Sequence, residues 1–188
     1  MKIRYIFEYV RSYFAERKST AGGISDEEER VREESLARHY LTDFGDSMLK
    51  MAYSYLHNYA DAEEVVQDAL IKVLRADPTF ENDAHAKAYL LTTVANLSKN
   101  RIDFNRIRAT DELSEELVHE EREDLSFVWE AVKKLSPKYS EVIFLFYQEG
   151  YQTAEIARIL GRKESTIRSD LNRARAQLKD MLREEYDF

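Results

Sequence analysis

Two short helical segments joined by a tight turn occupy the stretch from Tyr151 to Lys179, YQTAEIARILGRKESTIRSDLNRARAQLK. Gly161 follows the last apolar residue of the first segment, and helices commonly end on a glycine in the left-handed conformation. In the second segment, apolar residues recur at the spacing of one helical face: Ile167, Leu171, Ala174 and Leu178. The stretch therefore predicts a helix-turn-helix whose second helix reads a DNA major groove.

The opposite face of the second segment is polar and basic, with Arg168, Ser169, Asn172, Arg173, Arg175 and Lys179. Residues 161–179 contain six Lys or Arg and two acids, a net charge of +4 in a chain whose total is -8. Positive charge gathered on one helix is typical of a surface that contacts phosphates. The alternative at this point is a helical hairpin whose basic face is only solvated.

The composition favours an all-α protein, because the 188 residues include only five Gly and two Pro. The absence of Cys excludes disulfides, thiolate metal sites and a cysteine nucleophile, and it fits a cytoplasmic location. No apolar run approaches the roughly 20 residues that span a bilayer, and charges interrupt the N-terminus, so we expect neither a membrane helix nor a signal peptide. Since an acidic chain repels DNA, contacts with DNA must be confined to basic patches.

We predict two small helical domains, residues 36–106 and 125–188, joined by an acidic linker at 107–124 and preceded by an extension at 1–35. The extension begins with an amphipathic helix over residues 1–18, whose apolar stripe is Ile3, Ile6, Phe7, Val10 and Phe14. We expect it to pack on this chain or on a partner rather than on a membrane surface. Gly22 and Gly23 then predict a hinge, and Ser25 is a candidate N-cap for the next helix.

The first domain begins with a helix over residues 36–57. After a short break at 58–60, Asp61 is a candidate N-cap with Glu64 three residues later, and the helix that follows runs over residues 62–75. Its apolar positions are Val65, Val66, Ala69, Leu70, Val73 and Leu74. The other face carries Glu63, Glu64, Gln67 and Asp68; without a converging His we expect a solvated or protein-binding face rather than a metal site.

A loop over residues 78–83 carries one aromatic residue, Phe80, and precedes a long helix over residues 84–106. The stretch 85–108 is basic, with five Lys or Arg and one acid. The polar residues Asn96, Lys99, Asn100 and Asn105 can hydrogen-bond bases or phosphates, and Phe80 can stack on a base. Positive charge beside an aromatic side chain suits single-stranded or melted DNA.

The second domain follows a stretch that is rich in acids and poor in apolar residues. Ser136 and Pro137 are an N-cap and an N1 residue. The apolar run over residues 139–148 suits a strand by composition, but the Ser-Pro start and the stop at Gly150 favour a buried helix.

Four segments, taken in order along the chain, together resemble regions 2 and 4 of the extracytoplasmic-function (ECF) group of sigma factors. They are DAEEVVQDAL (residues 61–70), KAYLLTTVANLSKN (87–100), LSPKYSEVIFLFYQEGYQTAEIARILG (135–161) and STIRSDLNRARAQLK (165–179). The resemblance covers residues 36–182. It implies a bacterial RNA polymerase sigma factor that directs promoter recognition and transcription initiation. It also implies a protein that is not itself an enzyme and has no cofactor, no metal and no small-molecule substrate.

The resemblance also implies roles for individual residues. The core-polymerase surface, facing the β′ clamp helices, would be Asp61, Glu64, Gln67 and Asp68. The −10 element of promoter DNA would meet Phe80, Asn82, Asp83, Asn96, Lys99 and Asn100, with Phe80 capturing a flipped base. The −35 element would meet Arg168, Ser169, Asp170, Asn172 and Arg173, while the second domain docks on the β flap. An anti-sigma factor is a possible further partner.

Several residues depart from the family pattern. Arg162 and Lys163 follow the turn glycine where an apolar residue and a Ser or Pro are usual, and Asp170 stands where a basic or neutral residue is common. Gln152 replaces the usual capping Ser, which leaves Thr153 as the expected cap.

Two other functions stay open: a stand-alone helix-turn-helix regulator with an N-terminal sensing domain, and a helical enzyme. The four His residues show no metalloprotease or nucleophile–base spacing, which disfavours the enzyme.

Overall fold

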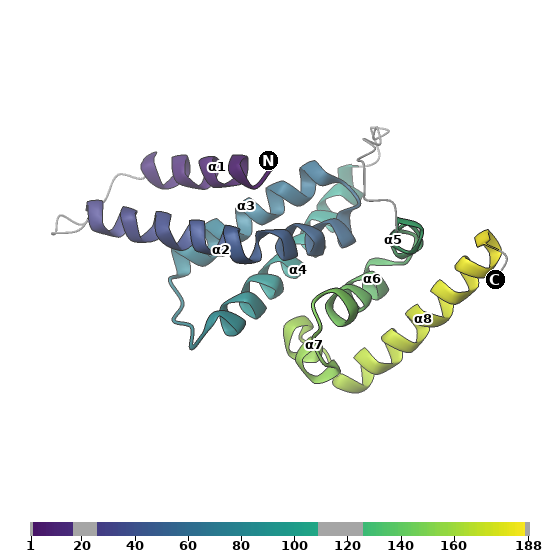
Figure 1. Ribbon diagram of the computed structural model, residues 1–188. Helices are drawn as coiled ribbons and strands as arrows, with labels where there is room; N and C mark the ends of the chain where they lie inside the picture. The colour runs from purple at the N-terminus through teal and green to yellow at the C-terminus, as the bar shows by residue number, and fades with distance from the viewer. Residues whose placement is uncertain (1, 17–25, 109–125, 187–188) are drawn as a thin grey trace.

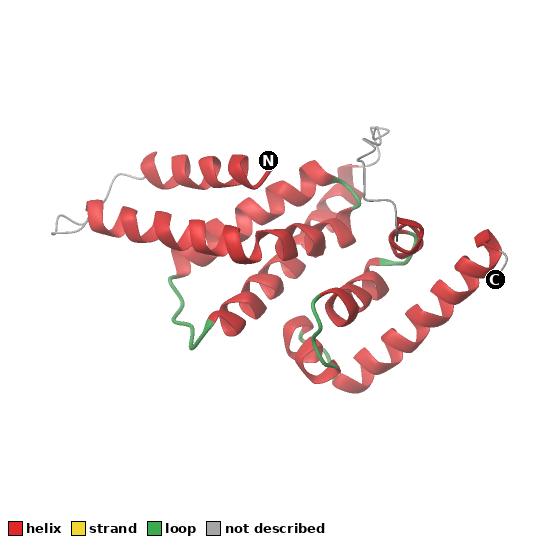
Figure 2. Ribbon diagram, viewed as in Figure 1, coloured by secondary structure: helices red, strands yellow, loops and turns green. Residues whose placement is uncertain are grey.

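The computed structural model describes residues 2–16, 26–108 and 126–186. Within these ranges the regular structure is helical and no strand is present, as Figure 2 shows. The elements are α1 (Lys2–Glu16), α2 (Asp26–Leu56), α3 (Tyr59–Ala76), α4 (Asp83–Arg108), α5 (Ser126–Lys133), α6 (Pro137–Ile143), the π-helical segment η1 (Phe144–Gln148), α7 (Thr153–Leu160) and α8 (Glu164–Tyr186). The predicted all-α class is therefore confirmed. None of the described helices is both long and apolar enough to cross a bilayer.

Helices α2, α3 and α4 pack against one another and form the N-terminal body (Figure 1). The apolar positions predicted for α3, from Val65 to Leu74, are all buried in it. On α4, Leu90 and Val94 are buried, whereas Tyr89 is 40% exposed. Helix α3 buries one face because its apolar residues repeat with the helical period, and this leaves its acidic residues at the surface.

Helix α1 lies against α2 and α3, as Figure 1 shows. Ile6, Phe7 and Val10 are buried in this contact, and the Arg38 guanidinium lies 4.4 Å from the centre of the Phe7 ring. Of the two predicted alternatives, packing on this chain or on a partner, the amphipathic helix thus packs on this chain. The predicted hinge at Gly22 and Gly23 and the predicted cap Ser25 lie outside the described residues.

The start of α3 differs from the prediction. The N-cap is Asn58, whose side chain accepts a hydrogen bond from the backbone N–H of Asp61 at 3.1 Å. Asp61 is therefore a first-turn residue, and the predicted break at 58–60 is mostly helical. Both Asn and Asp are good caps, and the helix takes the earlier one because this adds a turn. At the other end Asp77 adopts a left-handed φ of 42° and precedes Pro78.

Helices α5 to α8 form the C-terminal body. Ser136 is extended and precedes Pro137 at the first position of α6, as predicted. The apolar run is helical rather than extended, because α6 continues into η1, and Gly150 follows with a φ of 73°. Gly161 ends α7 with a φ of 62°, which confirms the turn of the predicted helix-turn-helix. The first segment of the motif begins differently: Gln152 rather than Thr153 is its N-cap, and its backbone N–H donates to Glu155 at 2.8 Å.

The two bodies pack on each other. Helix α6 lies against α2 and α7 lies against α4 (Figure 1), so one continuous buried core includes residues of both. The Ser140 hydroxyl on α6 donates to the Ser54 carbonyl on α2 at 2.9 Å. The predicted linker begins later than expected, since α4 extends to Arg108, and its remaining residues lie outside the described ranges.

Candidate functional site

The acidic face of α3 is partly neutralised by α4. Arg101 donates to Asp61 at 3.1 Å and to Glu64 at 2.7 Å, and Asn105 donates to the second oxygen of Asp61 at 3.1 Å. Asp68 is exposed one turn further along, and partial burial raises its pKa although Arg101 acts in the opposite direction. The structure therefore brings the predicted polymerase-binding residues to one face. Ion pairs anchor Asp61 and Glu64, whereas Asp68 forms no ion pair within the described residues.

Phe80 lies in an aromatic cluster that the sequence analysis did not predict. Its ring centre is 5.4 Å from Tyr89, 5.5 Å from His85 and 6.4 Å from Tyr40. Phe80 is half-buried, and Tyr89 keeps 40% of its surface exposed. Aromatic rings that are held by neighbours but open on one side can stack on a base with little loss of side-chain entropy.

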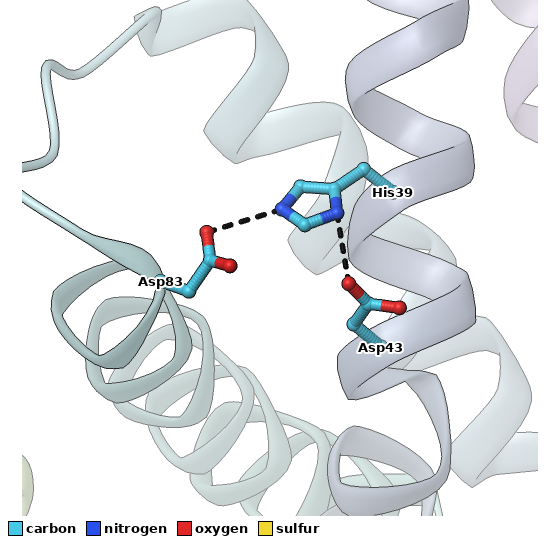
Figure 3. Close-up of side chains that lie close together, drawn as sticks. All are labelled: His39, Asp43 and Asp83. Atoms are coloured by element: carbon cyan, nitrogen blue, oxygen red, sulfur yellow. Dashed lines mark hydrogen bonds and ion pairs between the residues drawn. The ribbon is translucent and has the colours of Figure 1, made fainter.

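The loop that carries Phe80 is fixed at its C-terminal end by two polar contacts. The Asn82 side chain caps α4 by accepting from the backbone N–H of His85 at 2.9 Å. Asp83 lies 3.2 Å from one ring nitrogen of His39, and Asp43 lies 2.9 Å from the other (Figure 3). Because the two carboxylates meet opposite nitrogens, an ion bound at one nitrogen would not face both, and the three residues fit a hydrogen-bonded clamp better than a metal site.

The polar residues of α4 differ in their availability. Asn96 and Asn100 are exposed, whereas Lys99 is half-buried. The Lys99 ammonium lies 3.8 Å from a carboxylate oxygen of Glu141 on α6, and it lies 5.8 Å from the centre of the Tyr55 ring. Burial, followed by the positive charge of Arg162, lowers the pKa of Lys99. Of the predicted −10 residues on this helix, the two asparagines are thus free to reach a ligand and the lysine is engaged by the C-terminal body.

The outer face of α8 presents Arg168, Asn172 and Arg173 to solvent, and Ser169 is half-exposed. The Glu164 carboxylate accepts two hydrogen bonds from Arg168, at 2.6 and 3.1 Å, and a third from the Thr153 hydroxyl at 2.7 Å. These contacts tie the start of α7 to the start of α8 and hold the Arg168 guanidinium in place.

Asp170 does not lie on that outer face. It is 1% exposed and forms ion pairs with Lys138 at 2.8 Å and with Arg162 at 3.5 Å. The expectation that Asp170 offers a carboxylate to the DNA groove is therefore wrong. Its position on the helix, three residues after Ile167, turns it toward the interior of the body.

Arg162 also pairs with Glu141, which is fully buried on α6. Glu141, Arg162 and Asp170 thus form a buried charge cluster within the C-terminal body, with Lys138 and Lys99 at its edges. Glu141 was not among the predicted site residues. The available signal was an acid inside an apolar run, together with an arginine and an aspartate at positions where the family pattern is different.

Comparisons with known proteins match both bodies. Residues 36–107 match the family described as Sigma-70 region 2, and residues 128–178 match Sigma-70, region 4. RNA polymerase sigma factor SigV of Bacillus subtilis is 29% identical over 152 residues, which cover 77% of this chain and 90% of SigV. The ECF RNA polymerase sigma factor SigM of Mycobacterium tuberculosis is 28% identical over 176 residues, covering 86% of this chain and 90% of SigM.

Solved structures agree with this similarity. The sigma factor RpoE of Bartonella quintana, crystallised with the anti-sigma factor NepR, superposes with a TM-score of 0.65 at 26% identity, covering 79% of this chain and 97% of RpoE. CnrH, solved in complex with the cytosolic domain of CnrY, gives a TM-score of 0.57 at 21% identity over 98% of this chain and 99% of CnrH, and it supports the fold alone.

Proposed function

Because this chain belongs to the sigma-70 family of RNA polymerase sigma factors, in its ECF group, and acts in transcription initiation, we propose how its surfaces divide that work. The N-terminal body binds core polymerase and the −10 element, and the C-terminal body binds the −35 element and the β flap. The polymerase performs the chemistry, so this chain supplies recognition and no catalytic residue. Its place of action is the cytoplasm, where polymerase and DNA meet.

Core polymerase binds the acidic face of α3 through its β′ clamp helices. Asp68 and Gln67 make the direct contacts, because they are the least engaged by the chain itself. Asp61 and Glu64 contribute charge while Arg101 fixes their orientation. Carboxylates held in advance lose little conformational freedom on binding, so this anchoring favours association.

The −10 element binds as melted DNA across the Phe80 loop and α4. Phe80 stacks on an unpaired base, and Asn96 and Asn100 hydrogen-bond base edges or phosphates. Lys99 adds a phosphate contact once it leaves Glu141. Asn82 and Asp83 act indirectly in this proposal, because Asn82 caps α4 and Asp83 is bound to His39.

The −35 element binds as duplex DNA along the outer face of α8. Arg168, Asn172 and Arg173 face the major groove, and Ser169 reaches a phosphate. The two hydrogen bonds to Glu164 restrict the conformations of the Arg168 guanidinium, and a guanidinium held in one orientation can discriminate between bases. Asp170 has no DNA contact in this proposal.

An anti-sigma factor is a further proposed partner. The support is the RpoE structure, which contains the anti-sigma factor NepR and matches 79% of this chain. Such a partner would compete with polymerase or DNA for the surfaces described above.

The observation that carries the proposal is the pairing of an acidic α3 face with two separate DNA-reading surfaces on one chain. The test is a mobility shift on fluorescent promoter fragments, with this protein alone, with core polymerase alone, and with both. We expect a specific complex only when both are present. Tight, sequence-specific duplex binding by the free protein, unchanged by core, would instead indicate a stand-alone regulator.

A further inference from the structure

Lys87 on α4 forms an ion pair with Glu149, which directly follows η1. Their charged atoms are 2.6 Å apart, and the Ser47 hydroxyl on α2 donates to the same carboxylate oxygen at 3.0 Å. The Glu149 side chain is 5% exposed. A carboxylate of the C-terminal body is thus inserted between two helices of the N-terminal body and is satisfied there.

The second contact joins Lys99 to Glu141, 12 residues further along α4, or about 18 Å at the helical rise. The Ser140 hydroxyl, beside Glu141, donates to the α2 backbone. Two acids of the C-terminal body therefore hold two lysines at separated points of one basic helix. Both lysines lie in the stretch that the sequence analysis singled out as basic and suited to melted DNA.

We propose that Glu141 and Glu149 form a docking surface on the C-terminal body for Lys87 and Lys99 of α4. DNA phosphates compete with this surface for the same two lysines. The two carboxylates occupy the positions beside Lys87 and Lys99 that phosphate groups would take. The closed arrangement is then the DNA-free form of the protein. The inference rests on the proposed function only for the identity of the competing ligand.

The contact is of a kind that a ligand can open. Each pair removes its carboxylate from water, and the cost of that desolvation leaves the pair little net stability. Glu141 is 0% exposed, and its Oε2, which lies 3.8 Å from the Lys99 ammonium, has no hydrogen-bond partner within the described part of the chain. DNA offers the lysines fully charged phosphates without this desolvation of a partner carboxylate, so exchange of one for the other is favourable.

The test combines a distance measurement with DNA binding. The chain has no Cys, so exposed Lys72 and Gln177 can be replaced by cysteines and labelled with a fluorescent donor and acceptor, one on each body. Energy transfer is measured in the otherwise unaltered chain, in Ser47→Ala plus Glu149→Gln, and in the control Asp180→Asn, an exposed carboxylate of α8. The same proteins are titrated with a fluorescent single-stranded oligonucleotide of mixed sequence at low salt.

We expect Ser47→Ala plus Glu149→Gln to lower energy transfer and to tighten oligonucleotide binding by about 5-fold or more, while Asp180→Asn, with the same change in net charge, changes neither. Adding oligonucleotide to the unaltered chain should also lower energy transfer. If the double variant shows the same energy transfer as the control, Glu141 and Glu149 do not form a docking surface. If energy transfer falls while DNA binding stays the same, the docking does not compete with DNA. Neither result depends on the proposed binding of polymerase by α3. Unfolding curves for each variant separate opening of the contact from loss of the fold.

Discussion

The guanidinium of Arg162 lies against the buried carboxylate of Glu141. Arg162 follows the turn glycine of the helix-turn-helix, so this contact ties the turn between α7 and α8 to α6. Asp170 on α8 joins the same cluster from the other side. Two departures from the family pattern, Arg162 and Asp170, therefore pair with each other, and both fix α8 in the C-terminal body.

The raised pKa of the buried Glu141 should make the stability of the folded chain depend on pH. Burial raises the pKa of Glu141 from its ordinary value of 4.5 to about 7, with Arg162 opposing the rise and Asp170 adding to it. The pKa of Glu141 is higher in the folded protein than in the unfolded chain. Its stabilising contribution is therefore complete at pH values below the unfolded pKa, and it is lost as the pH rises through about 7. Between about pH 5 and pH 8 the chain should lose stability relative to Glu141→Gln, by on the order of 2–3 kcal/mol.

Thermal or urea unfolding at several pH values checks this difference. Glu130→Gln, an exposed position of the same body, serves as the control and should follow the unaltered chain. Parallel stability profiles for Glu141→Gln and the unaltered chain would show that Glu141 stays ionised throughout.

Asp68→Arg should weaken binding to core polymerase. Asp68 is exposed on the α3 face and forms no ion pair within the described residues, so reversing its charge places a cation against the partner surface without disturbing the buried residues. Truncating or reversing a charge at such an interface typically costs about 2–5 kcal/mol when the site is desolvated. The affinity for core is measured by fluorescence anisotropy, with Asp46→Arg, at an exposed position on α2, as the matched charge reversal. Equal affinities for the two variants would mean that the acidic face is only solvated.

Arg173→Ala should reduce initiation that depends on the −35 element. The side chain is exposed on the outer face of α8, and loss of a base contact costs about 1–3 kcal/mol of discrimination. Transcription from a library randomised at the −35 element measures the change in base preference. Lys179→Ala, a basic residue further along the same helix, should weaken binding with little change in preference. If both variants keep the original preference, Arg173 contacts phosphate rather than a base.

Ile6→Ala should destabilise the N-terminal body. Ile6 on α1 is 2% exposed, and replacing a buried Ile by Ala typically costs about 2–5 kcal/mol. Tyr9→Ala is the control, because Tyr9 is 50% exposed on the same helix. Urea unfolding compares the two. Unchanged stability for Ile6→Ala would show that α1 is dispensable for the body and acts only at the surface.

The sequence predicted most of the local structure because the signals are themselves local. The spacing of Ile167, Leu171 and Ala174 predicted the buried face of α8, and all three are buried. Gly161 and the Ser136–Pro137 pair marked helix ends for steric reasons that hold in any context. The α3 cap was wrong because Asn58 and Asp61 both favour capping, and only the packing of the added turn decides between them.

The contacts between distant residues were not predictable in the same way. The family resemblance assigned Asp170 to the groove, yet its ion pairs with Lys138 and Arg162 hold it inside the body. Likewise, the pairs Lys87–Glu149 and Lys99–Glu141 join two bodies whose relative placement no periodicity encodes. Those pairs decide which of the predicted DNA-binding residues are free.

The central claim is tested most directly by sequencing the 5′ ends of transcripts made on genomic DNA by core polymerase together with this protein. The account predicts start sites that are absent with core alone and that share two conserved upstream elements, one for each DNA-reading surface. The same start sites should be lost with Asp68→Arg and should change their −35 sequence with Arg173→Ala. Start sites identical to those of core alone would contradict the account.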